Sequence, residues 1–423
     1  MTITATSTCM IVGTGPAGLA AALSLAKVGA EVTLAGPPAP VAAAADTRTA
    51  ALFNGSITLL QNLGVWPELE EVSAPLEAIR IIDDTGGLLR APEVLFEARE
   101  VGEAVFGWNV PNAPLAEALW QAIRRDERIK VVETARVEHV EIRPDEAVAR
   151  TVEGEELRAR LIAAADGRRS ICRAAAGIAT TAWDYDQAAI ATRFAHSRPH
   201  GSVSTEFHRK SGPFTTVPLP GMESGLVWVE RPAIARRMVE LDEDGFRVVL
   251  ETRLQGLLGH VGAIGPRRLF PLSGLTAEAY ARARVALIGE AGHVIPPIGA
   301  QGLNLGLRDA ATLADCVAEA MARGDDVGGQ EVMQRYHALR KVDVETRIMA
   351  VDALNRTLLS TLLPVSLLRG FGMHLIRAFG PLKRALIRQG LEPVGPRPRL
   401  MESVGMAATA ARADQEPVDA GAD

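Results

Sequence analysis

The stretch CMIVGTGPAG, residues 9–18, decides the fold of this chain. Its first four residues, 9–12, are apolar, which is typical of a buried parallel strand. The pattern Gly-x-Gly-x-x-Gly follows at once, and the apolar run 19–28 indicates a helix. A second apolar segment, 31–35, completes a strand–helix–strand unit of the length that binds a dinucleotide. We therefore expect an α/β fold with a Rossmann-like domain.

The three glycines of this pattern have separate roles in binding a dinucleotide. Gly13 allows the tight turn, Gly15 lets the backbone approach a pyrophosphate, and Gly18 lets the helix pack on the strand. The N–H groups at the start of the helix then bind phosphate oxygens. Gly36 stands where an acidic residue usually binds the adenosine ribose, so we expect that contact to come from elsewhere.

A second transition from strand to helix lies in LIAAADGRRSICR, residues 161–173. Its apolar strand ends in Asp166 and Gly167, and a new helix follows. A carboxylate at the end of a strand is suited to bind the hydroxyl groups of a cofactor's ribityl chain. The stretch therefore predicts a second contact with the same dinucleotide.

A third transition lies in VALIGEAGHVIPPIGAQGLNLGLRD, residues 285–309. Its strand, 285–288, ends in Gly289 and Glu290, and a helix is expected over about 302–322. A glycine-rich helix start directs N–H groups and a positive dipole toward the ring edge that carries negative charge in a reduced flavin. Three such transitions in this order favour flavin adenine dinucleotide (FAD) over three unrelated turns.

The order of these motifs, GxGxxG, then DGxxS, then GEAxHxxxP and QGxN, resembles the class A flavoprotein aromatic hydroxylases, relatives of para-hydroxybenzoate hydroxylase. Within them the chain is most similar to the hydroxylases of ubiquinone biosynthesis. The similarity extends from about Thr8 to Arg399, so it covers nearly the whole chain. Shorter stretches that support it are 48–52, 109–112, 212–219, 227–228 and 270–272.

The resemblance implies an FAD-dependent monooxygenase that uses NADH or NADPH and dioxygen to hydroxylate an aromatic ring through a flavin C4a-hydroperoxide. A polyprenylated phenol of ubiquinone biosynthesis is the expected substrate. Two alternatives stay open at this point: a hydroxylase of a small soluble aromatic compound, and a non-catalytic flavin-binding assembly protein of a quinone pathway.

The resemblance also implies which residues contact the cofactor. His293, in the third motif, is a candidate catalytic residue that handles protons, with structural packing as its alternative role. Three residues depart from the family pattern: Glu290 replaces Asp, Gly292 replaces Ala, and Ala300 replaces Gly at a position where alanine resists a positive φ. The expected FAD contacts are Gly13, Gly15, Gly18, Arg48, Asn112, Asp166, Gly167, Gly289, Glu290, Pro297, Gly302, Leu303 and Asn304.

The domains are expected to be discontinuous in sequence. Alternating apolar and polar runs separated by turns predict that 76–108 and 181–272 form one antiparallel substrate-binding sheet that roofs the flavin. Helices are expected over 356–400, and the Ala- and Asp-rich end, 401–423, is expected to be a disordered tail. The FAD-binding domain then comprises 1–75, 109–180 and 273–355.

Composition limits the partners and the location. A net charge of −6 gives no reason to expect nucleic acid, and three scattered cysteines show no metal-ligand spacing. We read neither a signal peptide nor a membrane span, so a cytoplasmic location is expected. The stretch 358–389 is apolar and basic. It is suited to peripheral contact with the inner membrane face or with a pathway partner protein, or it is a packing helix with a solvated basic side.

Overall fold

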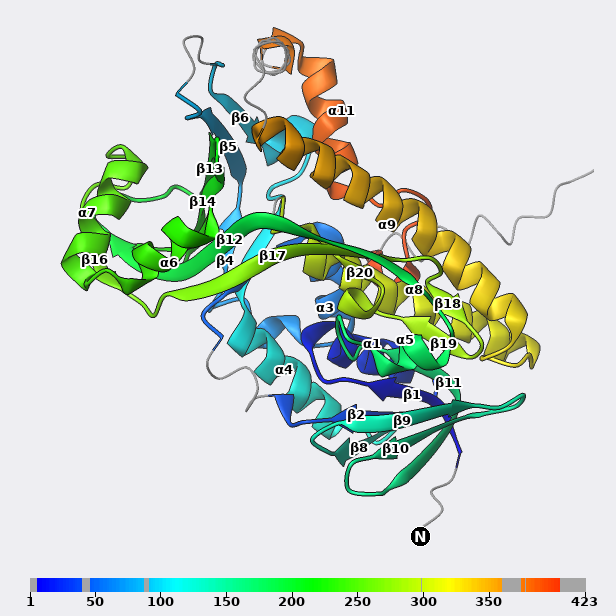
Figure 1. Cartoon of the computed structure of the whole chain (residues 1–423). Helices are drawn as coiled ribbons and strands as arrows, with labels where there is room; N and C mark the ends of the chain where they lie inside the picture. Colours follow the sequence, from blue (N-terminus) through cyan, green and yellow to red (C-terminus); the bar gives the residue numbers. More distant parts are fainter. Residues whose placement is uncertain are drawn as a thin grey trace, which may run out of the picture.

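Two large β-sheets organise the molecule, and the chain passes between them several times (Figure 1). The computed structural model describes residues 6–39, 46–86, 91–297, 299–359, 374–376 and 378–403. One sheet is largely parallel and carries the glycine-rich turns, and the other lies across it as a roof (Figure 1).

The first sheet, here the flavin sheet, has the strand order β18-β19-β11-β1-β2-β8. All neighbours from β19 to β8 are parallel, as expected for strands joined by crossover helices. Helices α1 and α8 pack against each other in the core cluster that covers one face. The elements are β1 (Ser7–Val12), α1 (Pro16–Lys27), β2 (Val32–Gly36), β8 (Ile129–Glu133), β9 (Val137–Ile142), β10 (Ala147–Thr151), β11 (Glu156–Ala164), α5 (Ile171–Ala175), β18 (Ala281–Arg282), β19 (Val285–Leu287) and α8 (Gln301–Arg323).

The second sheet, here the roof sheet, has the order β20-β17-β12-β15-β14-β13-β5-β6, with β16 beside β12. Strands β12 and β17 are long and run from beside the flavin sheet to the end of the roof sheet that lies by α6 (Figure 1). Its elements are β5 (Ala78–Asp83), β6 (Val94–Glu97), β12 (Thr180–His196), β13 (Val203–Arg209), β14 (Gly212–Leu219), β15 (Glu223–Glu230), α6 (Pro232–Glu240), α7 (Glu243–Leu254), β16 (Val261–Ile264), β17 (Arg268–Ala277) and β20 (His293–Val294).

A small third sheet, β3-β7-β4, joins the two large ones. Strand β3 leads directly into α3, and β7 leads into α4, which packs against α1. The bounds are β3 (Thr49–Phe53), α3 (Asn54–Asn62), η1 (Trp66–Glu68), β4 (Ala74–Leu76), η2 (Ala98–Val101), β7 (Gly107–Pro111) and α4 (Asn112–Arg125).

The predicted fold class is confirmed. The strands expected at 9–12, 31–35 and 285–288 and the helix expected over 302–322 are β1, β2, β19 and α8. One pair departs from the antiparallel expectation: β13 lies parallel to β5, because these strands come from separate segments of the chain. The domain boundaries stay a prediction; the one at 272/273 falls within β17.

The carboxy-terminal part is described only in pieces. The long helix α9 (Gln330–Leu359) runs along the molecule, and α11 (Gly380–Leu391) lies near its end (Figure 1). Of the predicted helical region and tail, 360–373, residue 377 and 404–423 lie outside the described residues. Met401, in η4 (Arg399–Met401), is buried close to Gly55. No helix among the described residues is both long and apolar enough to span a bilayer.

Candidate active site

The first glycine turn opens onto a cavity of about 500 Å³ between β1, β2 and the loop after β11. Gly13 has φ +112°, and a β-carbon there would lie 2.2 Å from the carbonyl oxygen of Ala165. Gly15, just before α1, has nothing within 4 Å of an added β-carbon, so its open side faces free space. A turn packed tightly on one side and open on the other is suited to hold a pyrophosphate on the amides of α1.

Thr14 accounts for the glycine, Gly36, at the position where an acidic residue usually binds the ribose. A β-carbon added to Gly36 would lie 2.9 Å from the Thr14 methyl group, so no longer side chain fits there without a shift. The Thr14 hydroxyl donates to the carbonyl of Pro37 at 2.6 Å. Arg136 and Arg169 line other parts of the same cavity.

Asp166 lies two residues after β11, with one carboxylate oxygen engaged and one without a partner among the described atoms. Its Oδ2 accepts a hydrogen bond from the Cys172 amide at 3.2 Å. Its Oδ1 is buried and has no hydrogen-bond partner among the described atoms, although it lines the cavity. Gly167 beside it has φ +78° and open space where a side chain would stand. A buried acceptor without a donor fits a cofactor hydroxyl.

Arg48 and Asn112 share a carboxylate that the sequence did not single out. Asp46 accepts from Arg48 Nη2 at 2.7 Å and from Asn112 Nδ2 at 3.0 Å. Burial tends to raise the pKa of Asp46, but these hydrogen bonds outweigh it and lower that pKa. The Arg48 guanidinium also lies over the Phe270 ring, 4.7 Å from its centre. Asn112 Oδ1 is buried without a partner among the described atoms.

The loop after β19 brings the third motif to the edge of the roof sheet. Gly289 and Glu290 follow the strand, and the Glu290 carboxylate pairs with Arg168 Nε at 3.1 Å. Arg168 donates to the Ser273 hydroxyl at 2.7 Å, so it joins the loop to β17. Gly292, where the family has Ala, leaves room for Tyr280, whose ring would lie 3.2 Å from an added β-carbon.

Two consecutive residues directly before helix α8 lie in the left-handed region, Gly299 at φ +66° and Ala300 at φ +53°. The alanine therefore adopts the conformation that glycine would take more easily. Asn304 ties this start to β3, because Oδ1 accepts from the Phe53 amide and Nδ2 donates to the Ala51 carbonyl. Around Gly302 there is open space, and Gln301 Oε1 is buried without a described partner.

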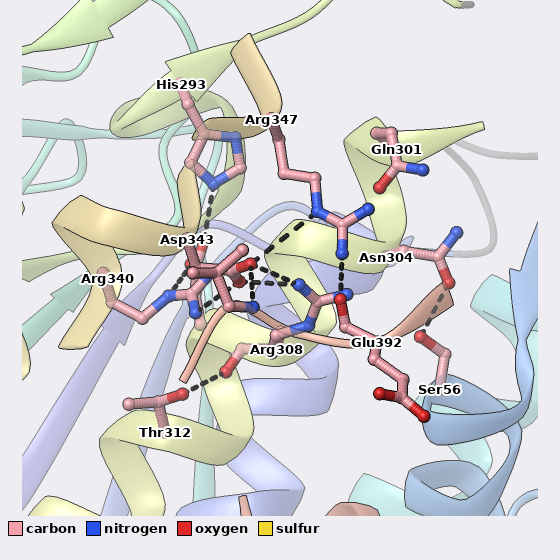
Figure 2. A network of polar contacts seen from close by, with 12 residues as sticks. Ser56, His293, Gln301, Asn304, Arg308, Thr312, Arg340, Asp343, Arg347 and Glu392 are labelled. Atoms are coloured by element: carbon pink, nitrogen blue, oxygen red, sulfur yellow. Dashed lines mark hydrogen bonds and ion pairs between the residues drawn. The ribbon is translucent and has the colours of Figure 1, made fainter. Parts of the chain in front are cut away.

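His293, in β20, is almost fully buried. Its Nε2 donates to Asp309 Oδ2 at 2.7 Å, and the same oxygen accepts from the Gly289 amide at 2.8 Å. Arg340 donates to the other oxygen of Asp309 at 2.6 Å. Burial would raise the pKa of Asp309, but His293 and Arg340 lower it to about 2. Figure 2 shows His293 and Arg340 at one end of a larger polar network.

A second cavity, of about 380 Å³, lies between the roof sheet and the third motif. Three strands supply its small or apolar walls, among them Ala189 and Ala191 of β12, Val227 of β15 and Phe270 of β17. Its polar end holds Arg48, Arg168, Ser273 and Glu290, and Pro296 and Pro297 complete the floor.

The first cavity and the start of α8 together meet the needs of one cofactor. The unpartnered buried oxygens of Asp166, Asn112 and Gln301, together with the open glycines, fit FAD. A Rossmann-like sheet with a roofed cavity beside the ring-binding motif defines the class: an FAD-dependent monooxygenase.

Comparison with known proteins agrees with this assignment. The sequence model of one family, described as FAD binding domain, matches residues 5–350, and the chain belongs to this family. It is 35% identical to the ubiquinone hydroxylase UbiL of Rhodospirillum rubrum, over 93% of this chain and 92% of that one. It is 29% identical to the 3-demethoxyubiquinol 3-hydroxylase of Escherichia coli, over 90% and 97%. The structure of p-nitrophenol 4-monooxygenase PnpA from Pseudomonas putida shares the fold, with a TM-score of 0.74 at 18% identity over 92% of this chain and 99% of that one.

Seven of the thirteen predicted FAD contacts line the two cavities, namely Gly13, Gly15, Asp166 and Gly167 in the first and Arg48, Glu290 and Pro297 in the second. The other six do not line either one: Gly18, Asn112, Gly289, Gly302, Leu303 and Asn304. The structure adds four residues that sequence reasoning missed. Asp46 stands two residues before the singled-out Arg48, and Arg168 lies inside the second motif. Asp309 ends the third motif as quoted, but nothing in the pattern indicated its partner Arg340, 31 residues further on. The roles of the individual site residues, including His293, stay predictions.

Proposed function

We propose that the protein hydroxylates the ring of a polyprenylated phenol, or a related precursor, in ubiquinone biosynthesis, with NADH or NADPH as electron donor. The observation that carries the proposal is the cavity between the roof sheet and the third motif, apolar along β12, β15 and β17 and polar at one end. The named activities of the two curated relatives support the same substrate class.

The overall reaction consumes one aromatic C–H bond, one dioxygen, one NAD(P)H and one proton, and it gives the ring-hydroxylated product, NAD(P)⁺ and water. FAD, when bound, accepts the electrons of the nicotinamide and passes them to dioxygen so that one oxygen atom reaches the ring. The work of the protein is to bind and orient both partners and to keep water out.

The residues that would hold FAD follow from the free groups of the site. The amides at the start of α1 would bind the pyrophosphate, and Asp166 Oδ1 would accept from a cofactor hydroxyl. The amides of Gly302 and Leu303, at the positive end of α8, would face the ring edge that becomes negative on reduction. Glu290 would lie along the ribityl chain.

The roof sheet would orient the substrate. A phenol with its hydroxyl toward Arg48 and Arg168 would place its ring against Phe270, with an apolar substituent along Ala189 and Val227. Hydrogen bonds donated by Arg48 and Arg168 would stabilise the partly deprotonated form of that hydroxyl, which makes the ring more electron-rich. The apolar walls would shield the bound ring from water on that side of the cavity.

We assign His293 a positioning role in this reaction. Its ring is buried, and its Nε2 is engaged by Asp309 rather than directed at the roofed cavity. This geometry supports a loop-holding residue over one that exchanges protons with the substrate.

The test is NAD(P)H oxidation by the FAD-loaded protein with a prenylated phenol and, in parallel, the same phenol without its prenyl chain. The expected result is stimulated oxidation with the prenylated compound and a product that carries one atom of ¹⁸O from labelled dioxygen. Equal or better turnover of the unprenylated phenol would instead assign a small soluble aromatic substrate.

We also propose peripheral contact of the protein with the cytoplasmic face of the membrane, through the outer side of α11. Phe379, Leu382 and Leu386 are exposed there, and Arg384 and Arg388 are exposed on the same helix. Exposed apolar groups beside arginines suit an anionic lipid surface. Cosedimentation with vesicles of phosphatidylglycerol, lost in the Arg384→Glu/Arg388→Glu variant, would support this. Equal retention of the variant would show that α11 does not make the contact through these arginines, and no retention of the parent would favour contact with a partner protein.

A further inference from the structure

A buried network of charged residues connects the third motif to the carboxy-terminal end of the described chain (Figure 2). Its first member is Asp309 of α8. Both carboxylate oxygens of Asp309 are engaged, one by Gly289 and His293 and the other by Arg340. The position of the Gly289 amide is therefore fixed by a side chain two turns inside α8.

The middle of the network lies between α8 and α9. Arg340 also donates to Asp343 Oδ2 at 2.9 Å, and Arg308 donates to both oxygens of Asp343, at 2.8 Å and 2.6 Å. Asp343 and its two arginines are almost fully buried. Burial tends to raise the pKa of Asp343, but Arg308 and Arg340 outweigh it and lower that pKa, so the carboxylate stays ionised.

The far end of the network holds residues 390–394, which we call the strap. Arg347 donates to the carbonyl of Gly390 at 2.7 Å and to the carbonyl of Glu392 (Figure 2). The amide of Val394 donates to Asp343 Oδ1 at 3.1 Å. Gln301, the first residue of α8, contacts the Gly390 carbonyl at 3.4 Å, so the strap touches the flavin-binding end of α8 directly as well.

The arginines of the network outnumber its carboxylates. Among the described residues, the three guanidinium groups of Arg308, Arg340 and Arg347 face only the carboxylates of Asp309 and Asp343. Removing charges from water costs several kcal/mol per ion, and a buried ion pair often adds little to stability compared with apolar residues. The strap carbonyls are therefore needed to solvate Arg347, which makes the strap part of the network and not a separate covering segment.

We propose that this network couples the strap to the third motif. In it, Asp309 positions the loop at Gly289, and Arg347 transmits the docking of the strap to Asp309. Undocking the strap would leave Arg347 short of hydrogen bonds and would disturb Asp343, Arg340 and then Asp309. The strap would in this way control how tightly FAD is held without touching it. The proposal depends on FAD binding and not on which phenol is the substrate.

The test uses Arg347→Gln, which removes the charge at the strap end, far along α9 from the third motif. The matched control is Arg335→Gln, because Arg335 also joins α9 to α8, through Glu319, but at an exposed site. FAD affinity is measured by titrating apoprotein at a temperature well below both melting points. Amide hydrogen exchange is followed in peptides that cover 289–293 and 390–394.

The expected result is a dissociation constant for FAD raised about tenfold in Arg347→Gln, within the range of ordinary coupling free energies. Exchange should become faster in both peptides, whereas Arg335→Gln should match the parent protein. Faster exchange confined to 390–394 with unchanged FAD affinity would overturn the proposal, since the strap would then be a local covering only. If Arg347→Gln does not fold, Arg347→Lys, which keeps the charge but loses the paired donors, is judged by the same two outcomes.

Discussion

The α-carbon of Gly13 faces the carbonyl oxygen of Ala165, and a β-carbon at residue 13 would approach that oxygen to 2.2 Å. At Gly15, two residues on, an added β-carbon would meet no atom within 4 Å. One turn therefore contains a glycine required by the protein's own packing and another whose open side faces the cofactor cavity.

Gly13→Ala and Gly15→Ala should separate these two requirements. We expect Gly13→Ala to destabilise the apoprotein strongly, because backbone must move and φ is positive there. Gly15→Ala should leave the melting temperature of the apoprotein nearly unchanged and weaken FAD binding at least about tenfold, as expected when a close backbone–phosphate approach is blocked. Thermal melting of apoprotein and FAD titration check both; an unaffected FAD affinity in Gly15→Ala would place the pyrophosphate elsewhere.

Ala300→Gly should stabilise the protein. Ala300 has φ +53°, a conformation that costs an L-residue about 1–2 kcal/mol more than glycine. We expect the free energy of unfolding in urea to rise by roughly 0.5–1 kcal/mol, after allowance for the larger entropy of an unfolded glycine. Ala350→Gly, the same change at an exposed position inside α9, is the control and should lower it by about as much. An equal loss of unfolding free energy in both variants would contradict the expected backbone strain at Ala300.

Ala191→Leu should fill part of the roofed cavity. The side chain of Ala191 lines it, and a leucine would occupy space in a volume of about 380 Å³. We expect the KM for a prenylated phenol to rise at least about tenfold, in line with the effect of steric mismatch in apolar pockets, while FAD affinity stays unchanged. Ala182→Leu, on the exposed part of the same strand, should have neither effect. An unchanged KM would place the substrate outside this cavity.

Acid should destabilise the protein through Asp309. Burial opposes ionisation of this carboxylate, but His293 and Arg340 lower its pKa from 3.8 to about 2 in the folded state. Because the folded pKa is the lower one, the stabilisation is present above pH 4 and is lost as pH falls toward 2. Its size is on the order of 2 kcal/mol. Unfolding in urea between pH 5 and 2 should show this loss in the parent and a smaller one in Asp309→Asn; parallel curves would argue against it.

The local sequence could predict those parts of the site whose geometry is set by the backbone. A strand that ends in glycine before a helix specifies its own geometry, and so β1, β19 and α8 were placed within one or two residues. Residues that depart from the family pattern could also be recognised from the sequence, but the side chains that fill the space around them could not. Thr14 beside Gly36 and Tyr280 beside Gly292 fill space from other positions in the chain, and such neighbours depend on the fold.

Side-chain partners over long separations were beyond reach of the sequence. Asp309 meets Arg340 and His293 only because α8, α9 and the loop after β19 pack together. His293 was noticed for its chemistry and its place in the motif, yet its burial is set by residues outside that motif. The parallel pairing of β13 with β5 has the same origin, since nothing in either strand specifies its neighbour.

The strand order of the flavin sheet also has a consequence during synthesis. Strand β11 ends at Ala164, and the strand that covers the outer edge of its last residues, 162–164, is β19, which begins at Val285. At translation rates of about 5–20 residues per second, a ribosome needs roughly 6–25 seconds to make the intervening stretch. For that time residues 162–164 of β11 have an unpaired apolar edge, which is a template for pairing with another nascent chain. The pace at which the roof sheet emerges therefore bears on the yield of folded protein.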